Sequence, residues 1–359
     1  MKTEYLLVLN AHEKIGSQTI KKALASFDEN IEKLWKASEY ELTEKLGSKI
    51  ASLIVDAKKQ FSITEEIEKL QKLNIGYITM YDKNYPALLK EIPDHPAVLY
   101  VRGNIDALKL PGIAVVGSRK YTNYGRKIAY DLSKACAGAG LCIVSGLALG
   151  IDAVAHRAAL DVNGTTVGVL GCGLDKIYPA TNFSLGKEII ERGGAVISEF
   201  SPGTPPLVHH FPQRNRIIAG LSSGTLVIEA AEKSGALITA YCALDYNREV
   251  FSVPGNIDSE ASKGTNILIQ KGAKMVVCAE DIFDELDINV KKSEQKSKEI
   301  FPESVEEIKI KNCLASGDKS IDEIIVESKI NIVALSSTLS MMEMKGIVEN
   351  LGGGRFKLH

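Results

Sequence analysis

Seven short runs rich in β-branched residues, separated by glycine turns and helix-length stretches, occupy residues 110–280. The runs are GIAVVG (112–117), LCIVSG (141–146), TTVGVLG (165–171), GAVISE (194–199), TLVIEA (225–230), EVFSVPG (249–255) and AKMVVC (273–278). Continuous Val and Ile runs that alternate with helices are typical of a parallel sheet buried on both faces. We therefore predict an extended Rossmann-like, doubly wound α/β domain over 101–284, with its ligand beyond the carboxyl ends of the strands.

The segment 1–100 is predicted to form a separate helical module of the helix-hairpin-helix or SAM-like type. Two similar stretches, KIGSQTIKKALASF (14–27) and KLGSKIASLIVDAKKQF (45–61), each place Gly-Ser before an amphipathic helix. The turns could expose backbone N–H groups to an anion, as in helix-hairpin-helix DNA binders. Alternatively, Ser17 and Ser48 simply cap the helices, which the spacing favours slightly.

The C-terminal part of the chain is predicted to be a second folded unit after a linker. Residues 285–302 are charged and poor in apolar residues, and Pro302 bounds them. Residues 303–359 suggest three short helices and a glycine-rich β-hairpin, which resembles a winged-helix domain. The third of these helices carries little positive charge, so it could contact protein as well as DNA.

Composition places any anion site in a local patch. The 359-residue chain has a formal net charge of −2 and 45% hydrophobic residues, so it has no global attraction for nucleic acid or membrane. The six cysteines lack metal-ligand spacing and are expected to be reduced and buried, with no metal bound. The apolar run near the N-terminus is too short for a signal sequence or a membrane span, so we expect a cytoplasmic protein.

The loop after the first run of the α/β domain carries the first candidate anion site. Gly117 permits a tight turn, Ser118 and the following amides can face an anion at a helix N-terminus, and Arg119 can add a charged fork. The stretch 111–130 also contains Lys120, Arg126, Lys127 and three tyrosines but no acidic residue until Asp131. It is a basic patch interleaved with aromatic residues.

Two further post-strand loops add cations and aromatic rings. Lys176 and Tyr178 follow the third run, and the segment after the fourth run contains Phe211, Arg214, Asn215 and Arg216. Because the carboxyl ends of parallel strands share one edge of a sheet, we expect these residues to converge with Arg119. A single buried arginine could be structural, but several cations beside aromatic rings favour a site for a phosphodiester chain.

Other catalytic or cofactor readings receive less support. Gly171-Cys172-Gly173 lacks the third glycine of a dinucleotide fingerprint, and there is no phosphate-binding P-loop, so no cofactor is expected. Asp152 and His156 stand four apart on a predicted helix, but no third ligand or nucleophile is near. Asp152 is more simply a first-turn residue that complements the helix dipole, with His156 packed against it.

A partial motif keeps one enzymatic alternative open. The turn SSGT and Glu229 resemble the P-G-G-x-G-T-x-x-E loop of nucleoside-monophosphate phosphoribohydrolases, although Leu221-Ser222-Ser223 replaces Pro-Gly-Gly. A third possibility is an adaptor protein whose α/β domain is only a scaffold.

Eight blocks resemble, in order and spacing, the bacterial DNA-processing protein A family (DprA/Smf), over about 80–277. They are VVGSR, VSGLALGIDAVAHRAAL, GCGLDKIYPATN, SEFSPG, FPQRNRIIAGLS, EAAEKSGALITA, VFSVPGNI and KGTNILIQKGA. The resemblance implies a non-enzymatic homodimer that binds and protects single-stranded DNA and helps to load the RecA recombinase in natural transformation. The resemblance also implies which residues bind single-stranded DNA, namely Gly117, Ser118, Arg119, Lys176, Tyr178, Phe211, Arg214, Asn215 and Arg216. The family box often has a basic residue where this chain has Gln213.

Overall fold

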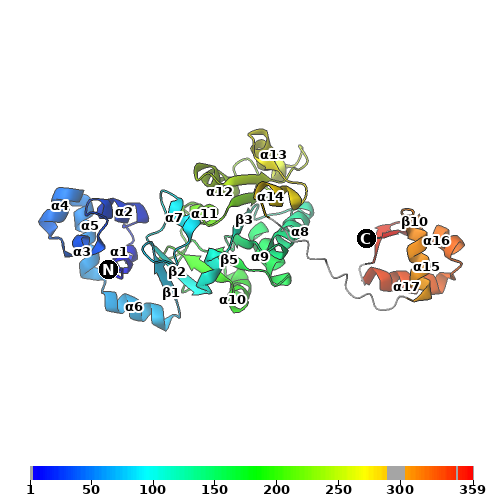
Figure 1. Cartoon of the computed structure of the whole chain (residues 1–359), viewed down its shortest axis with the longest axis horizontal. Coiled ribbons are helices and arrows are strands. Elements are labelled where there is room, and N and C mark those ends of the chain that lie inside the picture. The colour runs from blue at the N-terminus through cyan, green and yellow to red at the C-terminus, as the bar shows by residue number, and fades with distance from the viewer. Residues whose placement is uncertain (1–2, 289–303, 345–346, 359) are drawn as a thin grey trace. The chain divides into compact units, whose positions relative to one another are not determined.

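The computed structural model describes residues 3–288, 304–344 and 347–358, which form two compact units, Met1–Asn289 and Val290–His359 (Figure 1). Most of the predicted linker, 289–302, lies outside the described residues. Among the described residues, no single helix is both long and apolar enough to cross a membrane. Two successive helices, Ile321–Ser328 and Ile332–Glu343, are long and apolar enough only when taken together, and the chain bends by 112° between them.

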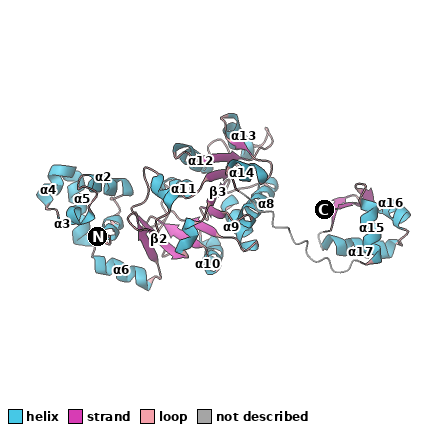
Figure 2. Ribbon diagram, in the orientation of Figure 1, coloured by secondary structure: helices cyan, strands magenta, loops and turns pink. Residues whose placement is uncertain are grey.

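The strands of the first unit, magenta in Figure 2, form a sheet at its centre. This sheet has nine strands in the order β1-β2-β6-β5-β4-β3-β7-β8-β9. Each of the seven predicted runs contains one strand of the parallel part, β3–β9, which confirms the doubly wound α/β prediction. These strands are β3 (Gly112–Val116), β4 (Cys142–Ser145), β5 (Thr166–Val169), β6 (Ala195–Ser198), β7 (Gly224–Val227), β8 (Glu249–Ser252) and β9 (Lys274–Met275).

The surroundings of strand β3 explain why its residues are apolar at every position. Ile113 and Val115 pack into one core together with Ala129 of helix α8 (Asn123–Gly138). Ala114 and Val116 face the opposite core, which also contains residues of α11 (His210–Gly220) and α12 (Gly235–Asp245). Both faces of the strand are therefore buried, as expected for a parallel sheet covered on both sides.

The remaining helices of the α/β part connect or flank these strands. They are α9 (Ile151–Asp161), α10 (Phe183–Glu191), α13 (Lys263–Gln270) and α14 (Glu280–Glu285), with the short 3₁₀ segments η1 (Ile105–Lys109), η2 (Ala180–Asn182) and η3 (Glu260–Ser262). The chain order reverses at β3, because β4, β5 and β6 extend to one side of it and β7, β8 and β9 to the other. This reversal is the topological switch point at which such folds bind ligands.

The predicted boundary at residue 100 is wrong, because the sheet begins earlier. The helical module consists of α1 (Tyr5–Ala11), α2 (Ser17–Ala25), α3 (Ile31–Lys36), α4 (Glu39–Leu46), α5 (Ser48–Gln60) and α6 (Ile63–Lys72). After it, β1 (Gly76–Thr79) and β2 (Val98–Gly103) flank α7 (Ala87–Glu91) and add two antiparallel strands to the edge of the sheet at β6. The run VLYV in β2 is buried because it lies between two other strands.

The two Gly-Ser turns of the helical module contradict the interpretation that the serines cap the helices, whereas the anion-binding interpretation stays a prediction. The N-cap residues are Gly16 and Gly47, and neither serine caps its helix. Gly47 has a φ of +80°, a backbone conformation that glycine adopts without steric cost. Ser17 is instead buried, and its hydroxyl contacts the Oε2 atom of Glu199 at 3.4 Å. This contact joins the helical module to the α/β part.

The second unit contains the three helices and the hairpin expected from its sequence. These are α15 (Val305–Leu314), α16 (Ile321–Ser328), α17 (Ile332–Met344), β11 (Val348–Gly352) and β12 (Arg355–Leu358), with β10 (Lys319–Ser320) pairing with β12. Ile310, Ile324, Leu335 and Phe356 belong to its core. Its assignment as a winged-helix domain stays a prediction.

The cysteines follow the burial expectation only in part. Cys136, Cys142, Cys172 and Cys313 are free and buried, whereas Cys242 is half-buried and Cys278 is exposed. Cys278 follows β9 at the sheet edge, where no neighbouring strand covers it.

Candidate nucleic-acid interface

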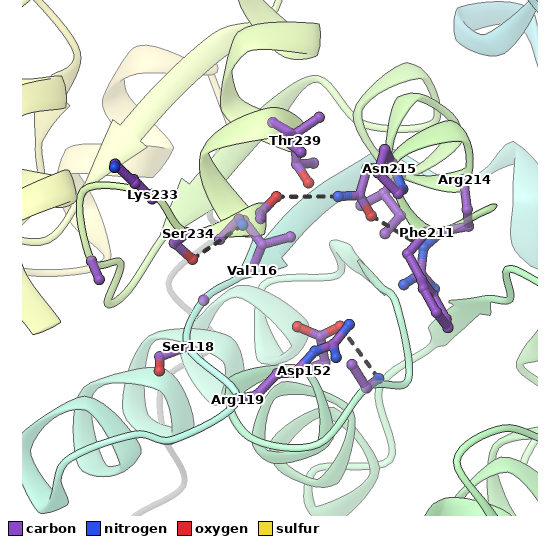
Figure 3. A pocket seen from close by; sticks show the side chains of 18 of the residues that line it. Val116, Ser118, Arg119, Asp152, Phe211, Arg214, Asn215, Lys233, Ser234 and Thr239 are labelled. Carbon is purple, nitrogen blue, oxygen red and sulfur yellow. Dashed lines mark hydrogen bonds between the residues drawn. The ribbon is translucent and has the colours of Figure 1, made fainter. Parts of the chain in front are cut away.

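A hollow of about 510 Å³ opens at the switch point between β3 and β7 (Figure 3). Its walls come from the loop after β3, from α11, and from the segment that leads from β7 into α12. Six predicted site residues line it, namely Gly117, Ser118, Arg119, Phe211, Arg214 and Asn215. The parallel topology therefore brings together segments almost 100 residues apart in sequence.

The loop after β3 is held tightly against the start of α9. A Cβ atom on Gly117 would lie 2.7 Å from the Cγ1 atom of Ile151, so a larger residue would push the loop away. The Ser118 carbonyl accepts a hydrogen bond from the Ile151 amide at 3.2 Å. The Ser118 hydroxyl closes a local turn, because it accepts a hydrogen bond from the Lys120 amide at 3.0 Å and donates one to the Lys120 carbonyl at 2.7 Å. Arg119 is thereby presented as an exposed cation.

Arg119, Phe211 and Tyr178 form a row of planar groups beside this hollow. The guanidinium carbon of Arg119 lies 5.5 Å from the centre of the Phe211 ring. The rings of Phe211 and Tyr178 are 5.8 Å apart between centroids, with an interplanar angle of 32°. All three line a smaller hollow of about 60 Å³, and Tyr178 is 45% exposed. Such a row can stack unpaired bases while the guanidinium contacts a phosphate.

Arg214 forms the floor of the hollow and is only 4% exposed. Its Nη1 atom donates to the Gly146 carbonyl at 2.6 Å and to the Val169 carbonyl, which links the ends of β4 and β5. Its Nε atom donates to the Oδ1 atom of Asn215 at 3.2 Å, and the Asn215 Nδ2 atom donates to the Gly235 carbonyl at 3.2 Å. Asn215 thus orients the arginine and fixes the start of α12.

Asp152 lies beside Arg214 and is also buried. Its Oδ2 atom accepts hydrogen bonds from the amides of Gly146 at 3.0 Å and Ala148 at 3.4 Å. Burial raises the pKa of Asp152, and the charge of Arg214 opposes that rise. Burial also lowers the pKa of Arg214 to about 10, with Asp152 acting in the opposite direction. The pair therefore places a protonated guanidinium under the hollow at neutral pH.

Arg216 does not join this group, which corrects the expectation that the predicted cations all converge. Successive residues of a helix are rotated by about 100°, so Arg216 lies on a different side of α11 from Arg214. Its guanidinium pairs with Glu199 and lies 3.5 Å from the Oδ2 atom of Asp94, and its side chain is 12% exposed. It lines a separate cleft that also includes Ser17 of the helical module.

Lys176 is exposed, but it is not among the residues that line either hollow beside Arg119. Sequence reasoning missed Lys233, which is exposed and lines the larger hollow just before α12. Ser234, the N-cap of α12, accepts a hydrogen bond from the Ala236 amide at 3.3 Å. The position of Lys233 after a parallel strand is the signal that could have identified it.

His156 contacts Thr166, a partner that the sequence did not predict; its packing against Asp152 stays a prediction. The Nδ1 atom of His156 lies 2.6 Å from the Thr166 Oγ1 atom, and burial lowers the pKa of this histidine to about 3. Asp152 does lie in the first turn of α9, as expected.

Glu229, the residue required by the phosphoribohydrolase alternative, is buried and engaged elsewhere. Its carboxylate accepts hydrogen bonds from the Thr122 amide at 2.9 Å and from the Thr122 hydroxyl. A Cβ atom on Gly125 would lie 2.2 Å from the Glu229 carboxylate, so the glutamate packs closely against the start of α8. Glu229 is not among the residues that line the switch-point hollow.

The fold and this hollow define a Rossmann-like protein with a cationic, aromatic-lined site at its switch point. The chain belongs to the DNA recombination-mediator protein A family, whose model matches residues 76–287. This result confirms the resemblance to DprA/Smf proteins. Protein Smf of Escherichia coli is 44% identical over 229 residues, which are 64% of this chain and 61% of that protein. The match therefore spans less than two thirds of that relative.

Two solved structures share the fold. The X-ray structure of DNA processing protein A from Streptococcus pneumoniae has 38% sequence identity and a TM-score of 0.70, and covers 79% of this chain and 97% of that chain. DNA processing protein A from Helicobacter pylori, whose structure concerns its single-stranded DNA binding mode, has 31% identity and a TM-score of 0.54. That match covers 60% of this chain and 97% of the other.

Proposed function

We propose that this protein binds single-stranded DNA in the switch-point hollow, and that it acts through binding rather than catalysis. The observation that carries this proposal is the row formed by Arg119, Phe211 and Tyr178 beside the hollow. Planar groups stack on any base, and a guanidinium contacts any phosphate, so this chemistry suits a flexible strand without sequence readout. The single-stranded DNA binding mode described for the Helicobacter pylori protein supports the same assignment.

The same site predicts a preference for single-stranded DNA over duplex DNA. Bases can reach the Phe211 and Tyr178 rings only when they are unpaired. Arg119 and Lys233 supply exposed positive charge at opposite walls of the hollow, while the buried Arg214 holds the ends of β4 and β5 in position. In this proposal, Gly117 and Ser118 shape the loop, Asn215 orients Arg214, and Lys176 contributes long-range attraction.

Fluorescence anisotropy with a labelled oligothymidine and a matched duplex at several salt concentrations tests this function. We expect tighter binding of the single strand and weaker binding by Arg119→Ala, with a slope of log affinity against log salt that is smaller by about 0.7. Lys109→Ala, which removes an exposed cation outside the hollow, is the control. Equal and weak binding of both DNA forms, unchanged by Arg119→Ala, would contradict the proposal and favour a scaffold role.

We further propose that the protein protects its bound strand and delivers it to the RecA recombinase in natural transformation and recombination, acting as a homodimer in the cytoplasm. Membership of the recombination-mediator family supports this role. Light scattering measures the oligomeric state, and RecA filament growth on a coated strand measures delivery. We expect faster filament growth with the protein than without it, and loss of the acceleration in Arg119→Ala.

The phosphoribohydrolase alternative is not favoured, because Glu229 holds the start of α8 instead of facing the hollow. Incubation of a nucleoside monophosphate at high protein concentration tests it directly. Glu229-dependent release of the free base would revive this alternative.

A further inference from the structure

A second groove, of about 760 Å³, lies beside the switch-point hollow on the side of α8 and α9. The start of α8 supplies Arg126 and Lys127 to this groove, and α9 supplies Arg157. The loop before α8 contributes Tyr121, and the segment 181–185 closes the far wall. None of these residues is needed for the site formed by Arg119, Phe211 and Tyr178.

The three hollows are neighbours that share lining residues. The small hollow under Tyr178 shares Arg119 and Phe211 with the switch-point hollow, and it shares Leu149 with the second groove. Close backbone packing causes this arrangement, because a Cβ atom on Gly150 would lie 2.2 Å from the Ser118 carbonyl oxygen. Gly150 has a φ of +90°, so glycine suits both the conformation and the close approach. The Leu149–Gly150 turn therefore lies directly against the Arg119 loop.

The charges of the second groove suit a polyanion. Three cations and one carboxylate, Asp131, line it. Arg157 is already paired, because its Nη1 atom lies 2.6 Å from the Oε2 atom of Glu188. Within the described part of the chain, Arg126 and Lys127 are exposed and form no ion pair of 4.0 Å or less. Two cations are thus available to contact an incoming phosphate chain.

The groove also offers aromatic surface of the kind found beside Arg119. Tyr121 is 41% exposed at its edge. The hydroxyl of Tyr130 donates to the Oδ2 atom of Asp161 at 2.9 Å, which fixes that ring on the groove wall. Cations and rings therefore recur in the switch-point hollow and in the second groove, and a repeated pattern along neighbouring hollows suits an extended chain better than a small ligand.

From these shared lining residues and the recurring cations and rings, we propose that one DNA single strand runs from the switch-point hollow past Arg119 into the second groove, where Arg126 and Lys127 contact its phosphates and Tyr121 stacks a base. This inference rests on the proposed function and extends it to the path and length of the bound strand. Short strands fill the switch-point hollow alone, and only longer strands reach Arg126 and Lys127.

Anisotropy with two oligothymidines, of about 5 and about 15 nucleotides, tests the path. In the double variant Arg126→Ala/Lys127→Ala, we expect roughly tenfold weaker binding of the long strand and a salt slope smaller by about 1.4, since about 0.7 is lost for each phosphate contact. Binding of the short strand should stay within about twofold of the wild-type value. Tyr121→Ala should weaken binding of the long strand without changing its salt slope.

Lys109→Ala/Lys187→Ala is the matched control, because it removes two exposed cations outside all three hollows. It should leave both strands bound as in the wild type. Equal losses for the short and long strands in Arg126→Ala/Lys127→Ala, or no loss for either, would overturn the path. Failure of the proposed function looks different, because the wild-type protein would then not bind the short strand or Arg119→Ala would not weaken it.

Discussion

Arg214 and Arg216 lie two residues apart on helix α11, and their guanidinium groups serve different parts of the molecule. Arg214 donates to the Gly146 and Val169 carbonyls under the switch-point hollow. Arg216 pairs with Glu199 in the cleft that faces the helical module. Through these two arginines, helix α11 contacts both the proposed DNA-binding site and the cleft beside the N-terminal module.

Replacement of Phe211 by leucine should separate stacking from charge. Phe211→Leu keeps an apolar side chain but removes the ring between Arg119 and Tyr178. We expect binding to oligothymidine to weaken by about 1–3 kcal/mol with an unchanged salt slope, since no phosphate contact is lost. Anisotropy at several salt concentrations measures both quantities. Leu244→Ala, an exposed change outside the hollow, is the control, and a reduced slope in Phe211→Leu would contradict the stacking role.

Loss of Arg214 should act mainly on the stability of the fold rather than on DNA binding directly. Arg214→Ala removes the donors to two strand-end carbonyls and leaves Asp152 buried without a neighbouring cation. We expect the free energy of unfolding to fall by about 3 kcal/mol, measured by urea denaturation. Arg119→Ala should change it by about 0.5 kcal/mol or less, because Arg119 is exposed. An Arg214→Ala variant as stable as the wild type that cannot bind DNA would instead make this arginine a direct contact.

Loss of Arg216 should produce a pH-dependent defect. Burial raises the pKa of Glu199, and Arg216 opposes that rise, so Arg216→Ala should raise the pKa further. A carboxyl group with a raised pKa in the folded state stabilises the fold as pH falls and loses that contribution as pH rises. The variant should therefore be less stable than the wild type near neutral pH, with a smaller difference at about pH 5.

Urea midpoints across this range measure the Arg216 effect. Glu199→Gln in the Arg216→Ala background should remove the pH dependence, because no carboxyl group then remains to titrate there. A difference from the wild type that is constant across the range would show that Glu199 is not its source.

His156 should contribute to acid sensitivity with the opposite sign. Its pKa falls from 6.5 to about 3 because burial disfavours the charged ring. A depressed pKa gives stability that is present above 6.5 and is lost as pH falls toward 3. We expect the free energy of unfolding to fall by about 1.4 kcal/mol for each pH unit between 6.5 and about 3. The His156→Gln variant should be less stable than the wild type at neutral pH, and its stability should depend less on pH between 6.5 and about 3. Urea denaturation across this range measures both effects. An unchanged pH profile would show that His156 is not the source of the acid sensitivity.

The parallel strands were predictable because their burial leaves a local pattern. A strand covered on both faces is apolar at successive positions, as in Ile113, Ala114, Val115 and Val116. Strand β1 lacks that pattern, because only its last two residues are buried. Strand β2 has an apolar run, VLYV, but it follows the helical module and joins the sheet through antiparallel pairing, so the run was not assigned to the α/β part. The predicted boundary at residue 100 therefore falls inside β2.

Among the predicted site residues, the sequence best placed those on the loop that directly follows β3, although their role in binding stays a prediction. Gly117, Ser118 and Arg119 follow β3 and line the hollow, because all carboxyl ends of the parallel strands share an edge. Arg216 was misplaced because a spacing of two on a helix changes the side that a residue faces. Lys233 was overlooked because only its position after a parallel strand, and no motif of its own, points to it.

The sequence by itself determined the strand runs and the glycine turns, since each depends on local sterics and burial. Only the tertiary structure decided which arginine is buried under the hollow, which pairs with Glu199, and which remains exposed beside Phe211. The physical reason is that the surroundings of a guanidinium are set by groups far away in the chain, whereas the conformation of a strand or turn is largely set by its own residues.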